Sequence, residues 1–573
     1  MKRLIVAVGL LLTMQQVSAQ STPSVDPMQD KNLMVWYHLD HAQSNIYGVN
    51  TQNAYKFLES KGLKAKPVVV GVLDSGVEVD HPGLKDAMWK NPNEVPGNGI
   101  DDDKNGYVDD VYGWNFIGGK NGDIDVDNME VTRVVKKYKP IFEGPNTETN
   151  KANQSKYAEE FAIYMKSKDI FTKKSIESMQ GFQTYSKINS LIPTIVNLLG
   201  DKKLTAESIA LIKPNSQDEA MAKSVMNSMV QDPSLLGKDG KEVAELMKAQ
   251  MKDALDYYGP MATKQYNLDF DPRAEIVGDD YENYNEKNYG NNHYEGPDAQ
   301  HGTHVAGIIA GQPYADQVQY GVASKVAKIM TVRTVPNGDE RDKDVANAIR
   351  YAVDNGAKIL NMSFGKPVSP GKDVVWDAFQ YAQSKGVLLV KAAGNENEDI
   401  AKSQYFPSNF KSSTDEKPFI DNMIVVGAST NSNEFLRASF SNFNGKMVDV
   451  FAPGEQIYST VPDGKYEYLQ GTSMASPVVA GAAAVLLAYM PELKPNEIIE
   501  ALVKTSNKST VNAMLPTNEN NRFDLISRAG GVIDLGKAAE YAYENYYAGK
   551  NKSKGLLRTK ASGRVSSSAT KVK

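Results

Sequence analysis

The fold of this chain is restricted above all by short, continuous apolar runs rich in Val, Ile and Leu. These runs occupy residues 67–73, 327–332, 358–362, 386–390 and 423–427. Strands buried on both faces of a parallel sheet have this composition, whereas strands with one wet face alternate apolar and polar residues. Helical patterns at 344–355 and 375–385 lie between three of the runs. We therefore predict an α/β fold with a mostly parallel central sheet flanked by helices.

A long segment interrupts this alternation of strands and helices. Between 118 and 297, Lys, Met and Glu become frequent and the buried β-branched runs disappear. Helical spacing is clearest from Lys241 to Tyr258, and Gly259-Pro260 is predicted to end that helix. We predict a first part of the α/β domain at 65–117, a mainly helical insertion at 118–297 and a second part at 298–545.

The two ends of the chain have the composition of processed or unfolded segments. Lys2 and Arg3 precede an apolar run and the small residues Val17-Ser18-Ala19, which predicts a signal peptide at 1–19 and export to the periplasm, the cell surface or the medium. A short N-terminal anchor is the alternative. Residues 20–64 form a polar, mixed extension, and the Lys/Ser/Thr-rich tail at 546–573 is predicted to be disordered. No later stretch predicts a transmembrane span.

Composition excludes several functional classes. The 573 residues include no Cys, which excludes disulfides, zinc–thiolate sites and a cysteine nucleophile. A net charge of −6 gives no electrostatic reason to expect a nucleic-acid partner. The sequence also contains no H-E-x-x-H motif, which argues against a metalloprotease of that type.

Three motifs carry residues suited to nucleophilic catalysis. Asp74 follows a buried strand, and the carboxyl ends of such strands gather functional groups. His301 opens the helical motif HGTHVAG, and Ser473 lies in GTSMASP at the start of an apolar helix. A serine needs a base to take its proton, and a buried carboxylate can hold the histidine that acts as this base. Each residue alone could be a cap or a turn residue; together they form a candidate triad.

In the order Asp, His, Ser, these motifs resemble the signatures of the subtilisin-like (subtilase, S8-type) serine protease family. The resemblance covers about 65–117 and 298–540. It implies a subtilisin-like domain and a secreted endopeptidase that hydrolyses peptide bonds through an acyl-enzyme. By this resemblance Asp74 orients His301, His301 is general base and then acid, and Ser473 is the nucleophile. The resemblance implies no cofactor for catalysis.

Two further segments carry the same resemblance. The asparagine of Ala392-Ala393-Gly394-Asn395 matches the family residue that donates to the oxyanion. The segment from Ser363 to Gly365 resembles an edge that pairs with protein or peptide substrates in extended conformation. Tyr405 occupies a position that the family keeps small, at the base of the P1 pocket, and predicts a shallow pocket. The predicted substrate-binding residues are Ser363, Phe364, Gly365, Ala393, Gly394 and Tyr405.

The chain departs from the family pattern in two ways. Asp74 and His301 lie much further apart than in compact subtilisins, because the predicted insertion separates them. Cleavage after Ala19 would leave only about 45 residues before the first strand, which is short for the usual folding prodomain. This argues against activation by prodomain removal. The insertion leaves from a loop near the site, so we hypothesise that it gates or selects substrates.

An acidic loop after residue 100 resembles the opening of a calcium-binding loop. Oxygen-bearing side chains alternate there, with Gly106 at the turn, although Tyr112 replaces the glutamate that ends a full EF-hand. A structural calcium ion and a plain Asp/Asn turn both remain open. The predicted ligands are Asp101, Asp103, Asn105, Asp109 and Asp110.

Three alternatives remain at the level of function. His304 follows His301 by one helical turn, but no third ligand with suitable spacing follows, so we predict a packing or capping role. The first alternative to a protease is a binding protein without catalytic activity, which would hold extended peptides and not cut them. A transpeptidase or ligase using the same acyl-enzyme is a second rival. Oligomeric state and natural substrate are not indicated by the sequence.

Overall fold

A computed structural model describes residues 34–516 and 521–549, which fall into two compact units. The sheet unit contains the described residues of Ser21–Asp125 and Pro272–Lys573, and the helical unit is Val126–Asp271. The predicted insertion was wider, since 118–125 and 272–297 belong to the sheet unit. The predicted signal peptide at 1–19 and the tail beyond 549 lie outside the described residues.

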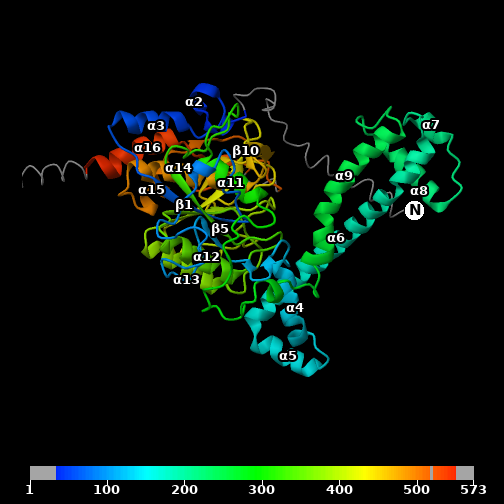
Figure 1. The fold of residues 1–573 in the computed structure, drawn as a ribbon, viewed down its shortest axis with the longest axis horizontal. Helices are drawn as coiled ribbons and strands as arrows, with labels where there is room; N and C mark the ends of the chain where they lie inside the picture. Colours follow the sequence, from blue (N-terminus) through cyan, green and yellow to red (C-terminus); the bar gives the residue numbers. More distant parts are fainter. Residues whose placement is uncertain (1–33, 517–520, 550–573) are drawn as a thin grey trace, which may run out of the picture. The chain divides into compact units, whose positions relative to one another are not determined.

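The sheet unit is built on a nine-stranded sheet in the order β12-β13-β9-β8-β7-β6-β1-β5-β2 (Figure 1). Every neighbouring pair is parallel except β12 and β13. The predicted mostly parallel α/β fold is therefore confirmed. The strands are β1 Val68–Asp74, β2 Gly113–Asn115, β5 Ala327–Arg333, β6 Ile359–Met362, β7 Leu388–Ala392, β8 Met423–Ser429, β9 Val450–Pro453, β12 Asn507–Lys508 and β13 Gly531–Val532.

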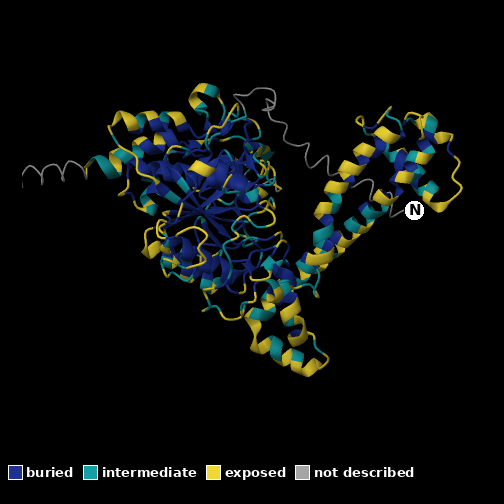
Figure 2. Cartoon of the chain, viewed as in Figure 1, coloured by how far each residue is buried: buried dark blue, intermediate teal, exposed yellow. Residues whose placement is uncertain are grey.

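Helices cover both faces of this sheet, which explains the continuous apolar runs. Val70 and Val72 of β1 pack in one core with α11 (Gln300–Ala310) and α14 (Thr472–Tyr489). Leu73 packs in a second core with α12 (Asp342–Asp354) and α13 (Lys372–Ser384). Successive strand residues alternate between the two cores, because strand side chains point to opposite faces. Figure 2 shows these layers as a buried interior with exposed outer helix faces.

Helix α14 is the most apolar element of the sheet unit. Among the described helices it is the one long and apolar enough to cross a membrane by length and composition, and 89% of it is buried inside the fold. Its surface is thus covered by the chain itself.

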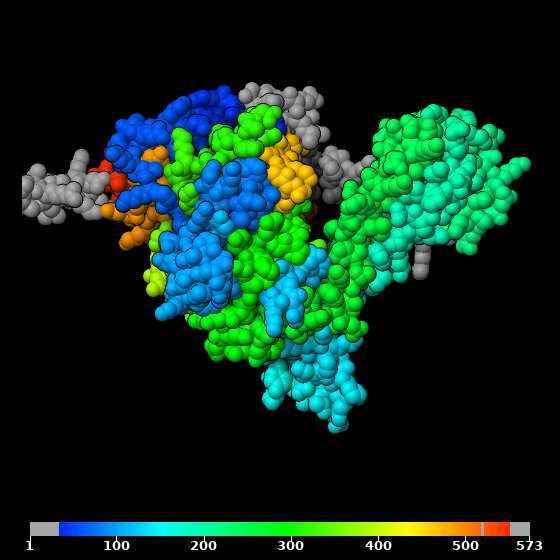
Figure 3. Space-filling view, in the orientation of Figure 1, coloured from blue at the N-terminus to red at the C-terminus, as the bar shows by residue number. Residues whose placement is uncertain are grey.

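The segment before β1 is part of the sheet unit's core rather than a polar extension. Trp36, Tyr37 and Leu58 have no exposed surface and join the core around α14. The hydroxyl of Tyr55 donates to the carbonyl of Val322 at 3.1 Å. The sequence does not reveal this role, because few apolar residues anchor the segment among many polar ones. In Figure 3 segments near the start of the sheet unit (dark blue) lie beside segments near its end (orange and red) on the surface of this unit.

The helical unit is a long hairpin of helices. Helix α6 (Ala158–Leu199) has 42 residues, which corresponds to about 63 Å. It packs along α9 (Gly240–Pro260), with α8 (Gln217–Met229) beside it. Helix α9 ends at Pro260, where Gly259-Pro260 was predicted to end it, and a π-helical turn at Met261–Gln265 follows directly.

The remaining elements are short. In the helical unit they are α4 Glu130–Phe142, α5 Thr147–Lys156 and α7 Ala206–Ala210. In the sheet unit they are η1 Trp36–His38, α2 His41–Ser44, α3 Thr51–Ser60, η2 Lys85–Ala87, β3 Gly118–Gly119, β4 Gly122–Asp123, α10 Arg273–Ile276, β10 Ile457–Val461, β11 Lys465–Leu469, α15 Pro495–Thr505, η4 Phe523–Leu525, α16 Leu535–Ala542 and η5 Tyr543–Tyr547.

Candidate active site

The predicted site residues gather at the carboxyl ends of three neighbouring strands. Asp74 ends β1, Ser363 directly follows β6, and Asn395 is the third residue after β7. His301 and Ser473 are each the second residue of a helix, in α11 and α14, and these two helices pack together. The parallel topology therefore brings motifs far apart in sequence to one edge of the sheet.

Asp74 and His301 form a short hydrogen bond. Nδ1 of His301 lies 2.6 Å from Oδ1 of Asp74, whose side chain is 2% exposed. Burial lowers the pKa of His301, but the charge of Asp74 and this hydrogen bond outweigh burial and leave the pKa above its ordinary value of 6.5. Gly302 permits this approach, since a Cβ there would lie 2.1 Å from the carbonyl oxygen of Gly76.

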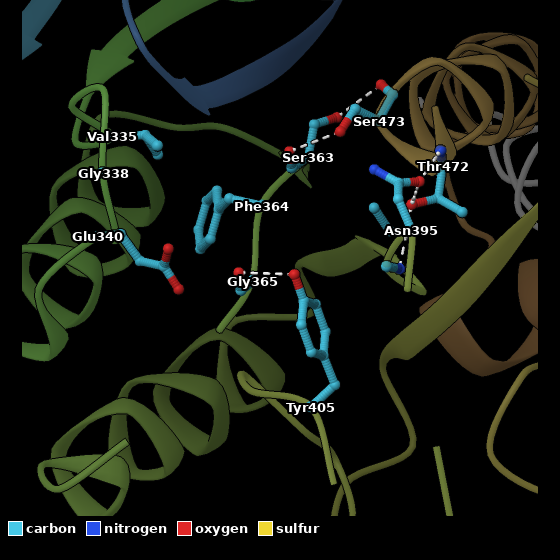
Figure 4. A pocket seen from close by; sticks show the side chains of 12 residues that line it. Val335, Gly338, Glu340, Ser363, Phe364, Gly365, Asn395, Tyr405, Thr472 and Ser473 are labelled. Carbon is cyan, nitrogen blue, oxygen red and sulfur yellow. Dashed lines mark hydrogen bonds between the residues drawn. The ribbon is translucent and has the colours of Figure 1, made fainter. Parts of the chain in front are cut away.

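The hydroxyl of Ser473 is hydrogen-bonded to a backbone carbonyl and not to His301. Its Oγ donates to the carbonyl oxygen of Ser363 at 2.9 Å (Figure 4). Within the described chain it has no hydrogen bond to His301, so the serine–imidazole contact requires a change at Ser473 χ1. Catalytic hydrogen bonds often close only when substrate is bound.

Asn395 is held with its amide nitrogen available. Its Oδ1 accepts from the backbone nitrogen of Thr472 at 2.8 Å and from the hydroxyl of Thr472 at 3.0 Å. The same hydroxyl accepts from the nitrogen of Gly394 at 3.0 Å. Nδ2 of Asn395 donates to no described residue and faces the pocket in Figure 4. This is the geometry that an oxyanion donor needs.

We expect replacement of Asn395 by Leu to lower kcat by about 10²–10³-fold with little change in KM, because the donor acts on charge that develops in the transition state. Steady-state kinetics on a short peptide measures both constants. Thr472→Val is the companion variant: it removes the hydroxyl that orients Asn395, and a smaller fall in kcat is expected. A rise in KM at constant kcat would instead make Asn395 a ground-state binding residue.

A pocket of about 210 Å³ opens beside Ser473. Ser363, Phe364, Gly365, Gly394 and Tyr405 of the predicted set line it, together with Ala392 and Glu340. Ala393, also predicted, does not line it, because its side chain is completely buried. The strand register turns Ala392 toward the pocket instead.

Tyr405 is the bulkiest of the predicted residues that line this pocket. Its hydroxyl donates to the carbonyl oxygen of Gly365 at 2.7 Å (Figure 4). A Cβ on Gly365 would lie 2.3 Å from the ring, so ring and backbone are in close contact. Nζ of Lys391 lies 4.8 Å from the ring centroid. A bulky ring fixed in this way supports the expectation of a shallow pocket.

His304 has the packing role predicted for it. Its Nε2 lies 3.0 Å from the carbonyl oxygen of Ile457, and the side chain is fully buried. Burial lowers its pKa to about 3, so the ring is neutral.

The acidic loop gathers a different set of carboxylates from the one predicted. Oxygens of Glu94, Asp101 and Asp103 lie within 4.8 Å of one another. Asp109 instead accepts hydrogen bonds from the backbone of residues 97–99. Asp110 accepts from Asn91 and Tyr351 and is buried, which raises its pKa to about 6. Oδ1 of Asn105 accepts from the nitrogen of Tyr107.

Glu94 completes that group and was missed by the sequence analysis. It is 7% exposed, and its Oε2 is buried without a hydrogen bond in the described structure. A buried carboxylate oxygen lacking a donor suits an oxygen-coordinated cation. Only its acidic character, seven residues before the loop, could have indicated it.

Comparison with known proteins identifies the family. The model of the subtilase family (Peptidase S8) matches residues 65–523, and the chain belongs to this family. It is 40% identical to a thermophilic serine proteinase of Bacillus sp. (strain AK1) over 210 residues, 36% of this chain and 47% of that protein. It is 36% identical to subtilisin DY of Bacillus licheniformis over 208 residues, 36% of this chain and 70% of that protein.

A further relative and a solved structure are also similar to part of the chain. The chain is 35% identical over 219 residues to a cell wall-associated protease of Bacillus subtilis (strain 168), 38% of this chain but 22% of that protein. The matched part therefore spans at most about half the length of the first two relatives. A solved cold-adapted subtilisin-like serine proteinase shares 32% identity, with a TM-score of 0.32, over 40% of this chain and 74% of that one.

Proposed function

We propose that this protein is a serine endopeptidase that hydrolyses peptide bonds through an acyl-enzyme. The observation that carries the proposal is the 2.6 Å contact of Asp74 with His301 at the carboxyl ends of the strands. Ser473, at the start of α14, is hydrogen-bonded to Ser363 at the same end of the sheet. Membership in the subtilase family supports it. The proposed triad is Asp74, His301 and Ser473.

In the proposed reaction, Ser473 exchanges its hydrogen bond to Ser363 for one to Nε2 of His301. Its Oγ attacks the substrate carbonyl while His301 takes the proton. The acyl bond forms as the peptide C–N bond breaks, and His301 gives its proton to the leaving amine. Water then repeats the sequence and releases the acid. The backbone nitrogen of Ser473, near the positive end of α14, and Nδ2 of Asn395 stabilise the oxyanion.

The substrate binds as an extended peptide along Ser363–Gly365. Strand addition satisfies the peptide's backbone, and side pockets read its side chains. The P1 side chain, which precedes the bond that is cut, enters the pocket above Tyr405. We also propose that the protein is exported, as its N-terminal residues predict.

Labelling with a fluorophosphonate tests this function, because only an activated serine reacts. We expect labelling of one site, mapped to Ser473 by peptide analysis. Absence of labelling together with tight peptide binding would favour the non-cutting scaffold. Analysis of products in the presence of added amines separates hydrolysis from transpeptidation.

We further propose that Glu94, Asp101 and Asp103 hold a structural calcium ion. Calcium would offset two of the three negative charges of these clustered carboxylates and would supply no chemistry to the reaction. The uncompensated oxygen of Glu94 supports this fit. The backbone donors to Asp101 and Asp103 would fix the loop around the ion.

Calcium at about 100 times its Kd is expected to raise Tm by about 5 °C relative to EDTA, since binding to the folded state alone contributes about 2.7 kcal/mol. Glu94→Gln should remove most of this rise. Differential scanning fluorimetry of Ser473→Ala avoids self-digestion. Glu416→Gln, an exposed carboxylate in another loop, is the matched control and should keep the full rise. Equal Tm values with and without calcium in the parent would favour the plain turn.

A further inference from the structure

A second cavity, of about 340 Å³, opens on the other side of the proposed catalytic residues. Asp74 and His301 line it, with Asp125, Asp298 and Arg333. It shares Ser363 and Val335 with the pocket beside Ser473. The two cavities are therefore neighbours along one substrate-binding edge.

The position of this cavity assigns it to one residue of a bound peptide. The side chain at P1 enters the pocket that contains Ser473 and Asn395, because these residues must flank the carbonyl under attack. Neighbouring residues of an extended peptide point to opposite faces. The preceding residue, P2, thus directs its side chain toward the cavity that borders His301.

Two exposed carboxylates distinguish this cavity chemically. Asp125 and Asp298 are both exposed, and neither forms an ion pair with a cation of the described chain. The backbone nitrogen of Asn337 donates to the carbonyl oxygen of Asp125 at 2.8 Å, which holds Asp125 at the rim. Oδ1 of Asp298 accepts from the nitrogen of Gln300 at 3.0 Å and so fixes Asp298 just before α11.

Arg333 interacts electrostatically with both carboxylates, but its single positive charge offsets only one of their two negative charges. Its guanidinium donates to the carbonyl oxygens of Ser75 and Ile124 and to Oδ1 of Asn115, and its side chain is 1% exposed. Two carboxylates at the rim face one buried cation, so the rim has a net negative charge. The floor adds an uncompensated acceptor, because Oδ2 of Asp74 is buried without a hydrogen bond in the described structure.

We propose that Asp125 and Asp298 make this cavity a subsite for a basic P2 side chain, Lys or Arg. The long aliphatic part of such a side chain would pack on Val335 and Pro336, and its charge would reach the carboxylates at the rim. This inference rests on the proposed endopeptidase function and specifies its substrate class.

The test compares two peptides that differ only in Lys or norleucine at P2. At low salt the parent should show a kcat/KM ratio of about tenfold in favour of Lys, since each exposed carboxylate contributes up to about fivefold. The double variant Asp125→Asn/Asp298→Asn should bring the ratio close to one; the amide oxygen of asparagine at 298 can still accept from the nitrogen of Gln300. Asp421→Asn should keep the ratio, because Asp421 is an exposed carboxylate just before β8, at the amino ends of the parallel strands and away from the site.

Every rate is divided by the concentration of active enzyme, which fluorophosphonate titration measures. Loss of folded protein in a variant therefore does not change its ratio of kcat/KM values. Raising the salt to 0.5 M should reduce the parent's preference, because screening weakens exposed charge pairs. A parent that cleaves both peptides equally, or a double variant that keeps the preference, would overturn this inference and leave the proposed function intact. A parent that is neither labelled nor active on any peptide would overturn both.

Discussion

Replacement of Ser473 by Ala is expected to lower kcat on the order of 10⁶-fold, the loss that follows removal of the nucleophile from a triad that acts as a unit. Only Oγ is removed, and its one hydrogen bond is to the carbonyl oxygen of Ser363. The backbone of Ser473 still accepts from Ser363, so α14 and the pocket should be preserved. We therefore expect KM for a short peptide and Tm to stay close to the parent values.

Single-turnover and steady-state assays on a fluorogenic peptide measure this loss, and circular dichroism checks the fold. Ser439→Ala is the matched control, because Ser439 is exposed and lies in a loop after β8. It should retain parental activity and fluorophosphonate labelling. A Ser473→Ala protein that keeps more than about one hundredth of parental kcat would place the nucleophile on another residue.

The central sheet could be predicted because each of its five middle strands needs two apolar faces. The apolar runs at 67–73 and 423–427 correspond closely to β1 and β8. The edge strands were not predicted: β2 and β12 are three and two residues long, too short for a periodic pattern. Their pairing depends on tertiary contacts that no local run encodes.

The candidate site also contains residues that local motifs predict and residues that only tertiary contacts bring into place. Asp74, His301 and Asn395 were predicted from local motifs, and the parallel topology brings those motifs together. Glu94 was not predicted, because burial of one carboxylate oxygen is a tertiary property. Asp125 reaches the cleft only through its backbone contact with Asn337, more than two hundred residues away in the sequence, and no motif marks that contact.

The role of the helical unit stays a hypothesis. Its hydrophobic core includes Leu191, Ile195 and Met247 and is separate from the two cores of the sheet unit. Helical periodicity predicted these buried positions, since they repeat at helical spacing.

Replacement of Asp74 by Asn is expected to lower kcat about 10⁴-fold near neutral pH. The amide keeps the shape of the carboxylate, but it removes the charge that stabilises the imidazolium. Its NH2 group can also donate to Nδ1 of His301 and so hold the ring in the wrong tautomer. Ser473 would still be present, so slow fluorophosphonate labelling should persist. Asp421→Asn serves as the control for replacing an exposed carboxylate and should leave kcat unchanged.

The pH profile separates this electrostatic role from a structural one. Protonated His301 cannot accept the proton of Ser473, so kcat/KM should fall as pH drops through the pKa of His301, with a midpoint above 6.5 in the parent. In Asp74→Asn, burial lowers this pKa without the opposing charge, so the midpoint should move to lower pH. A midpoint that does not move, with the same loss of kcat, would mean that Asp74 acts on the fold of the site and not on the imidazole.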